Sequence, residues 1–409
     1  MLNPANEVSP HFCVGPREVC RMVPDALVAW HAREHNETHL GIEICQPAYL
    51  PPFVDFEVRA AAEICAAELE AAGARVELVT MDAGRAHLLA SVGDVTDTSP
   101  VLSGHLDTVP VGDVPWTHGA LSGDISEGMV HGRGAADMKG GVAALVVAVA
   151  RHAARGDREP GALLVLTAGE ETGCSGARHL VGARQLPVGG PLLIAEPTGL
   201  EIAHGHKGVL WLTATSRGVS AHGSRPDLGQ SAILPLARFV AELAESGLPG
   251  SHPEMGGVTV NVGTFHGGTK INLVPDLASA ELDIRVVPCV DSADLRARVS
   301  ALAGPGISIE TTEDLPAVYS PADGPFAAHV STCCQRIVGA SVERPPLTYF
   351  TDASVLAGAL ASSEIVLLGP GEPDSAHTLD ECCPTSQIEA AADLYEDILA
   401  SWGDQPARA

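Results

Sequence analysis

The chain has 409 residues with 24 basic and 51 acidic side chains, which gives a formal net charge of −27. A single hydrophobic core stops growing at roughly 250–300 residues, so a chain of this length predicts two domains. Lysine occurs only at positions 139, 207 and 270, and no basic stripe is available to neutralise phosphates. The composition therefore argues against nucleic-acid binding.

The ten cysteines are scattered along the chain, with vicinal pairs at 333–334 and 382–383 and no CxxC motif. This spacing does not predict a disulfide framework. The sequence shows no signal peptide and no uninterrupted apolar stretch of about 18 residues, the length that a membrane span needs. We therefore expect a cytoplasmic protein with reduced thiols and no membrane contact.

Helices and strands alternate along most of the chain. One helix is predicted at 24–37, before prolines 47, 51 and 52 interrupt the chain. The elements that follow are a helix at 55–72, strands at 75–80, 87–92 and 101–106, a helix starting within 142–150, and strands at 162–166, 191–195 and 364–368. This alternation predicts an α/β domain with an open sheet.

The segment GHLDT at 104–108 follows an apolar strand. Its His105 and Asp107 alternate at strand spacing, so both side chains leave the same face. A histidine can bind a metal ion through one ring nitrogen while the other donates to a carboxylate that fixes the ring. The pair is a candidate ligand and orienter, although a hydrogen-bonded surface pair would have the same spacing.

Carboxylates follow the next predicted strands. Asp137 lies among glycines before an apolar helix, where it could bridge two metal ions or simply cap the helix. Glu170 and Glu171 follow the strand 162–166, at the end where open sheets expose catalytic groups. One of this pair could bind metal while the other takes a proton from water, although a solvated loop often contains two glutamates.

Two further candidates complete the set. Glu196 follows the short apolar strand 191–195, and His377 follows the strand 364–368 and a GPG turn. Two histidines and three carboxylates at strand ends form a nitrogen and oxygen ligand set that suits zinc, cobalt or manganese.

With these motifs, the chain resembles the di-zinc aminoacylase and carboxypeptidase family that includes acetylornithine deacetylase and succinyl-diaminopimelate desuccinylase. The resemblance covers about 350 residues, from roughly residue 55 to the C-terminus. It depends on these segments: SGHLDTVP, GRGAADMKGG, GEE, AEPT, His206-Lys207-Gly208, SAHGS at 220–224, and GPG followed by AHTLDE. HKG and the GPG-to-AHTLDE ending are most similar to the acetylornithine deacetylase branch.

The resemblance implies a role for each candidate residue. His105, Asp137 and Glu196 would hold one zinc ion, and Asp137, Glu171 and His377 the other, with Asp137 as the bridge. Glu170 would be the general base, and Asp107 would orient His105. The peptide bond after Asp137 would be cis.

The resemblance also implies a discontinuous catalytic domain with a mixed central sheet, at 1–204 and 314–409, and an inserted α+β lid domain at 205–313. Lid strands are expected at 209–215, 258–265, 278–287 and 307–312, with helices at 230–245 and 292–302. In relatives the lid forms a homodimer, and the counterpart of His222 reaches the partner's active site to stabilise an oxyanion. Asn272 and Arg285 match residues that contact the substrate carboxylate, although Arg285 could merely pair across a sheet and His222 could cap a loop.

These implications lead to an expected function. The chain would use two divalent metal ions, most simply zinc, to remove an acyl group, with acetyl as the first choice, from an N-acyl amino acid. YFTDA at 349–353 would line the pocket, with Asp352 facing a cationic side chain, although a turn would also favour this residue. Three alternatives remain open: a dipeptidase, carboxypeptidase or desuccinylase with the same site; an acyl-transfer or condensing enzyme; and a silent binding protein.

Overall fold

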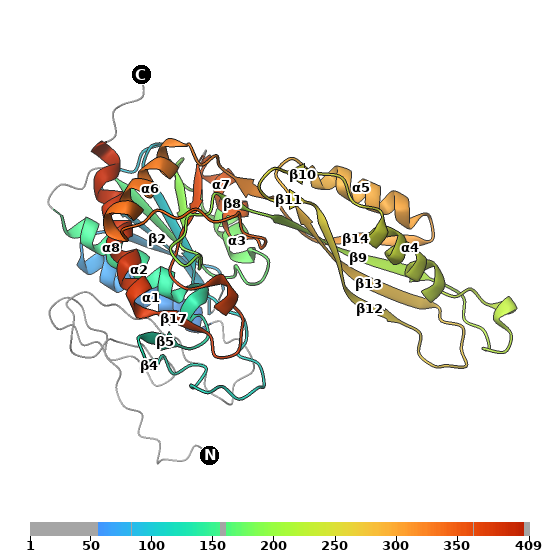
Figure 1. Ribbon diagram of the computed structural model, residues 1–409. Coiled ribbons are helices and arrows are strands. Elements are labelled where there is room, and N and C mark those ends of the chain that lie inside the picture. The colour runs from blue at the N-terminus through green and yellow to red at the C-terminus, as the bar shows by residue number, and fades with distance from the viewer. Residues whose placement is uncertain (1–55, 83, 156–160, 363, 405–409) are drawn as a thin grey trace, which may run out of the picture. The chain divides into compact units, whose positions relative to one another are not determined.

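The computed structural model describes residues 56–404, except 83, 156–160 and 363. These residues form two compact units (Figure 1). Within the described residues, the first comprises the chain up to His204, Ser320–Arg344 and the chain from Thr351 onward, and the second comprises Gly205–Tyr319 and Pro345–Phe350. The second unit therefore runs past the expected boundary at 313 and takes in a short segment from later in the chain. The helix expected at 24–37 lies outside the described residues.

The first unit is built around a six-stranded mixed sheet. Its strands, in spatial order, are β1 (Arg75–Thr80), β2 (Ala86–Val92), β6 (Ala162–Thr167), β3 (Val101–His105), β7 (Leu192–Ile194) and β16 (Ile365–Leu367). The first three pair antiparallel, whereas β6, β3, β7 and β16 run parallel. The carboxyl ends of the four parallel strands therefore meet at one edge of the sheet.

Helices pack on this sheet because its strands alternate apolar side chains between two faces. Leu164 and Leu166 of β6 face the largest buried cluster, which joins the sheet to α1 (Phe56–Ala71), α2 (Gly140–Ala154), α6 (Pro325–Ile337) and α8 (Thr385–Ser401). The helices α3 (Ser175–Ala183) and α7 (Ala353–Ala359) contact β6 and β7. A small sheet of β4 (Ile125–Ser126), β5 (Met129–His131) and β17 (Cys382–Pro384) completes the unit.

The predicted elements of the first unit are confirmed with shifts of one or two residues at most strand ends. The predicted elements lie where they were expected, but some elements of the first unit were not predicted. The prediction did not include α6 and α8, which pack against one another on the sheet. The predicted α/β class with a mixed central sheet and a smaller α+β unit is confirmed.

The second unit contains a four-stranded antiparallel sheet. Its strands, in spatial order, are β12 (Thr259–Gly267), β13 (Leu277–Val286), β9 (Gly208–Arg217) and β14 (Ile307–Leu315). Alternate residues of β9 and β13 pack against α4 (Ile233–Glu245) and α5 (Ser292–Ala303) in a separate core. The remaining short pairs are β8 (Gly205–His206) with β15 (Val318–Tyr319) and β10 (Ser251–His252) with β11 (Gly256–Gly257).

The two edges of this sheet differ in charge. The edge strand β14 includes Glu310, Glu313 and Asp314, whereas β12 has the sequence TVNVGTFHG and contains no acidic or basic residue other than histidine. Charged side chains on an edge strand oppose pairing with another chain. The β12 edge is therefore the one that remains open to further pairing.

Two remaining expectations concern the thiols and the membrane. No disulfide joins any two of the seven cysteines within the described residues. Among those same residues no helix is long and apolar enough to cross a membrane.

Candidate metal centre

The candidate ligands converge at the carboxyl edge of the parallel strands. His105 is the last residue of β3, and Glu171 and Glu196 follow β6 and β7. Asp137 lies in the short helical turn η1 (Ala135–Lys139) that precedes α2, and His377 lies in the loop between β16 and β17. The peptide bond between Asp137 and Met138 is cis, as predicted.

His105 has its two ring nitrogens in different environments. Nδ1 lies 2.9 Å from the main-chain carbonyl oxygen of Asp107, and a carbonyl only accepts, so Nδ1 donates. Nε2 lies 3.1 Å from Oδ1 of Asp137 and 3.9 Å from Oε1 of Glu196. The ring is 2 % exposed, so its orientation is set by these contacts rather than by solvent.

The two carboxylate oxygens of Asp137 face different histidines. Oδ1 faces His105, and Oδ2 lies 3.2 Å from Nε2 of His377. The same His377 nitrogen lies 3.0 Å from Oε1 of Glu171. Each histidine therefore meets a shared carboxylate, Asp137, and a second carboxylate of its own.

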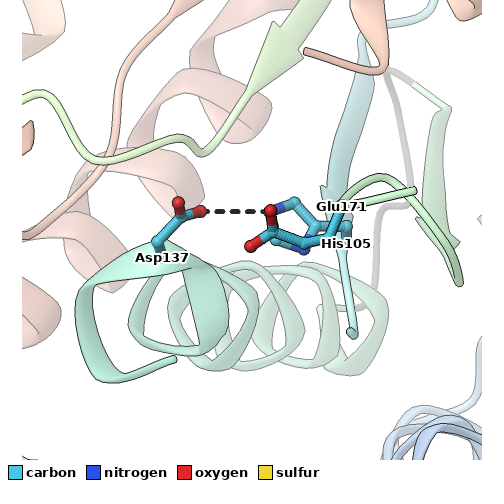
Figure 2. A group of neighbouring side chains, drawn as sticks. All are labelled: His105, Asp137 and Glu171. Carbon is cyan, nitrogen blue, oxygen red and sulfur yellow. Dashed lines mark hydrogen bonds and ion pairs between the residues drawn. The ribbon is translucent and has the colours of Figure 1, made fainter. Parts of the chain in front are cut away.

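Glu171 also lies close to the first histidine. Ligand atoms of His105, Asp137 and Glu171 all lie within 4.8 Å of one another, and Figure 2 shows the three side chains directed toward a common point. The structure thus brings together all five predicted ligands.

Asp107 contacts His105 in a different way from the expected one. Its carboxylate, which was expected to orient the ring, is 3.8 Å from Nδ1, and the main-chain carbonyl makes the hydrogen bond instead. The carboxylate accepts from the main-chain amides of Gly169 at 2.6 Å, Glu170 at 3.2 Å and Glu171 at 3.1 Å. Asp107 therefore links His105 to the loop that carries both glutamates.

Several buried charges interact in this centre. Burial raises the pKa of Glu170 and of Glu196 well above the usual range. Burial alone would lower the pKa of His105, but the hydrogen bond and charge of Asp137 outweigh it and raise this pKa. Hydrogen bonds to Asp137 and Glu171 raise the pKa of His377 to about 10. The site thus concentrates negative charge that protons or cations must compensate.

The donor atoms fit divalent ions. In a neutral His105 with its proton on Nδ1, Nε2 carries a lone pair directed at Asp137 and Glu196, whose carboxylate oxygens also only accept. Two acceptors at 3.1 Å repel each other unless a proton or a cation lies between them. Histidine nitrogens with carboxylate oxygens are the donor set of many zinc sites.

Asp352 lies in a different environment from the predicted one. It was expected to line a pocket and meet a cationic side chain, but it is 3 % exposed and precedes α7. One of its oxygens accepts a hydrogen bond from Thr167 at the end of β6. Burial raises the pKa of Asp352 to about 6. Asp352 is therefore buried against the end of β6, where Thr167 lies, and does not line an open pocket.

The predicted residues of the second unit form no single cluster. His222 and Asn272 are exposed on neighbouring segments, joined by a 2.7 Å hydrogen bond from the amide of Gly223 to the carbonyl of Asn272. Arg285 lies at the far end of the 10-residue β13, which at about 3.4 Å per residue is roughly 30 Å long. Arg285 pairs with Asp283 of its own strand at 2.9 Å, so the expected contact of Asn272 and Arg285 with one carboxylate is not made within one chain.

Two polar residues that were not predicted support the site. Glu381, the last residue of AHTLDE, is fully buried and accepts hydrogen bonds from the amides of Ala136 and Asp137. Its position in the motif was a signal that could have found it. His87 on β2 accepts from the amide of Ala168 at 3.1 Å. A single histidine within an apolar strand gives no such signal.

Comparison with protein families gives two matches. The model of peptidase family M20/M25/M40 matches residues 101–401. A model described as N-acetylmuramoyl-L-alanine amidase matches residues 2–88, of which the described part forms α1, β1 and the start of β2 in the first unit.

Individual relatives agree with the longer match. A probable succinyl-diaminopimelate desuccinylase from Staphylococcus epidermidis is 30% identical over 365 residues, covering 80% of this chain and 88% of the relative. The structure of an M20 family metallo-carboxypeptidase from Sulfolobus solfataricus has a TM-score of 0.74 at 17% identity, covering 85% of this chain and 95% of that one. A dinuclear metal-binding M20 peptidase from Bacillus subtilis has a TM-score of 0.62 at 15% identity, covering 84% and 91%. At these identities the two structures show a shared fold.

Proposed function

Since this chain belongs to peptidase family M20/M25/M40, a family of metal-dependent hydrolases of amide bonds, we propose that it hydrolyses the amide of an N-acyl amino acid with two divalent metal ions. The family membership confirms the resemblance drawn from the sequence motifs. The proposed catalytic and lid roles belong to the first and second units respectively.

One observation carries the two-ion proposal. Asp137 directs one oxygen to His105 and the other to His377, at 3.1 and 3.2 Å. A carboxylate that serves two ions about 3.5–4 Å apart needs this division of its oxygens. We assign His105, Asp137 and Glu196 to one ion and His377, Asp137 and Glu171 to the other, with zinc as the first candidate and cobalt or manganese as alternatives.

The chain's own residues divide the remaining work. Two bound ions would supply Lewis acidity to the scissile carbonyl and to the attacking water. Glu170, adjacent to a ligand and 6 % exposed, would take the proton of that water and deliver it to the leaving amine. The hydrogen bonds from the amides of residues 169–171 to Asp107 would hold the main chain at Glu170 in place.

His222 has the correct free nitrogen for stabilising an oxyanion. The amide of Ser224 donates to Nδ1 of His222 at 3.1 Å, so a neutral ring carries its proton on the exposed Nε2. Such a donor can stabilise a developing oxyanion. Because His222 lies on an exposed loop of the second unit, we propose that it serves the active site of a partner chain.

The uncharged edge of β12 supports such a partner. It leaves the hydrogen-bonding groups of an edge strand available, whereas the acidic β14 edge discourages pairing. A homodimer joined through two β12 edges would extend the four-stranded sheet across both chains.

Arg285 supports recognition of a substrate carboxylate. Its Nη1 is buried and has no hydrogen-bond partner among the described residues. Lys207 is close enough that the charge of Arg285, after burial, lowers the pKa of its ammonium group. Because Asn272 and Arg285 lie near opposite ends of β13, the two residues that contact one substrate would come from different chains of the dimer.

The proposal also concerns which acyl group the protein removes. Succinyl becomes the first candidate, because the curated relative from Staphylococcus epidermidis carries the name of a desuccinylase. A succinyl group adds a carboxylate that a cationic pair such as Lys207 and Arg285 would favour. Acetyl, the expectation from the HKG and AHTLDE segments, is the second candidate.

A substrate panel tests this proposal. N-succinyl, N-acetyl and N-formyl amino acids and simple dipeptides would be offered to the zinc- or cobalt-loaded protein and to its Glu170→Gln variant. We expect release of free amine from an N-succinyl or N-acetyl amino acid, and its loss in the variant. Preference for dipeptides would move the assignment to a peptidase. Silence of the loaded protein on every substrate would contradict hydrolysis and favour condensation or binding.

A further inference from the structure

We propose that Glu381 is a positioning residue that sets the spacing between the two halves of the metal centre, by fixing the main chain at Asp137 to the segment that carries His377. This inference rests on the proposed function, because it presupposes that these residues hold two ions.

The carboxylate of Glu381 contacts the main chain of the shared ligand itself. Its Oε1 accepts from the amide of Ala136 at 2.9 Å and from the amide of Asp137 at 3.0 Å. The side chain is 0 % exposed, so water does not compete for these hydrogen bonds. The position of the Asp137 backbone, and hence of its carboxylate, depends on Glu381.

The other oxygen of Glu381 is held by a buried cation. Nη1 of Arg133 donates to Oε2 at 2.6 Å, and Arg133 is itself 7 % exposed. The Arg133 guanidinium lies 5.0 Å from the ring centroid of Trp116, over the ring. Both oxygens of Glu381 are therefore occupied, which makes it a support for the ligands rather than a ligand.

The main chain of Glu381 extends the link toward His377, four residues earlier in the chain. The amide of Gly132 donates to the carbonyl of Glu381 at 2.9 Å, which continues the pairing of β17 with β5. Next to it, Asp380 accepts from the amide and the hydroxyl of Thr117 at 2.7 and 2.8 Å. Hydrogen bonds at Asp380 and at the carbonyl of Glu381 thus fix the main chain of the segment 377–381, which includes the side chain that contacts Asp137.

This arrangement has a consequence for metal binding. Asp137 and His377 come from segments far apart in sequence, yet their side chains must meet a common ion within a few tenths of an ångström. No other described side chain is shown to hydrogen-bond the main chain at Asp137. Loss of Glu381 should therefore weaken ion binding without removing any ligand.

The test compares Glu381→Ala and Glu381→Gln with a matched control, Glu364→Ala. Glu364 also accepts from a main-chain amide in the first unit, that of Phe326 at 2.7 Å, but at the amino end of β16. Zn²⁺ and Co²⁺ affinities would be measured by competition with a chromophoric chelator. The unfolding temperature of each metal-free protein would be measured in parallel, so that general destabilisation is seen separately.

We expect Glu381→Ala to lose about 10–100-fold in affinity for the ions, the range typical of residues that support metal ligands. Glu381→Gln keeps an oxygen for the two amides and should lose less, but at least about threefold. Glu364→Ala should retain wild-type affinity even if its unfolding temperature falls. If the alanine variant does not fold, the glutamine variant decides the matter.

Wild-type affinity in both Glu381 variants would overturn the inference and leave the proposed function standing. An equal loss in the Glu364 control would also overturn it, because the effect would then be general destabilisation. Failure of the wild-type protein to bind two ions would overturn the proposed function together with this inference.

Discussion

The two units use their functional residues differently. In the first unit, candidate ligands from separate strand ends meet in one buried cluster, in which His105 is 2 % exposed and both of its ring nitrogens contact oxygen atoms. In the second unit, His222 is exposed, and Arg285 lies at the other end of a sheet from Asn272. One chain brings the five candidate ligands together by itself, whereas the roles that we propose for His222, Asn272 and Arg285 require a partner chain.

The largest effect is expected from a change at the proposed general base, which lies in the first unit. Glu170→Gln removes the proposed proton acceptor but none of the proposed ligands, so kcat should fall by about 10²–10⁴-fold while two ions still bind. Activity and metal content measured on the same preparation check this. A variant with near wild-type kcat would remove Glu170 from the role of base.

The next effect concerns the dependence of one chain on the other. His222→Ala should lower kcat by about 10²–10³-fold, the effect of losing one oxyanion donor. Co-expression of His222→Ala and Glu170→Gln chains should restore activity, because one of the two sites in the mixed dimer then has both groups intact. Absence of complementation in a purified mixed dimer would mean that His222 does not act across chains.

A smaller effect is expected where the first unit holds its loop in position. Asp107→Asn puts an amide donor where the carboxylate accepts from main-chain amides, and so disturbs the loop that carries Glu170 and Glu171. We expect a loss of about 10–100-fold in metal affinity or kcat. Unchanged metal affinity and unchanged kcat would show that the main-chain carbonyl of Asp107 is sufficient to orient His105.

The open edge of the second unit offers a milder perturbation. Phe265→Lys places a charge on β12, whereas Thr312→Lys places one on the opposite edge, β14. The first change should weaken dimerisation by about tenfold or more, and the second should not. Light scattering over a range of concentrations distinguishes them, and an equal response at both edges would contradict pairing through β12.

The last prediction concerns stability, since a change at the buried histidine of the second unit, His206, should affect activity least. Burial lowers the pKa of His206 to about 4 in the folded protein, below its unfolded value of about 6.5. The unfolded state therefore binds the proton first, and stability falls as the pH drops from about 6.5 to about 4, by about 3 kcal/mol in total. His206→Gln should flatten this dependence, as measured by denaturant unfolding between pH 4 and 7. An unchanged slope would show that another group dominates.

The candidate ligands could be predicted because the segments that carry them also show the apolar pattern of strands. His105 ends an apolar strand, and Glu171 and Glu196 each follow one. Because parallel strands in an α/β sheet end at one edge, their meeting could be predicted from the sequence. The cis peptide after Asp137 followed from the family resemblance and not from the residues themselves.

Sequence reasoning failed where the outcome depends on tertiary burial. Whether Asp352 lines a pocket or lies under a strand end depends on the packing of α7, which has no local signature. The carboxylate of Asp107 was assigned to His105 from the spacing of the two residues, but the amides of the distant 169–171 loop take it instead. The distance between Asn272 and Arg285 could not be predicted either, because it depends on the length of β13.

The central claim is that Asp137 joins two ions in one centre of the first unit. Anomalous diffraction from crystals of the zinc- or cobalt-loaded protein tests it most directly. We predict two peaks about 3.5–4 Å apart, with one oxygen of Asp137 directed at each, His105 beside one peak and His377 beside the other. A single peak, or two peaks that Asp137 does not join, would contradict the account.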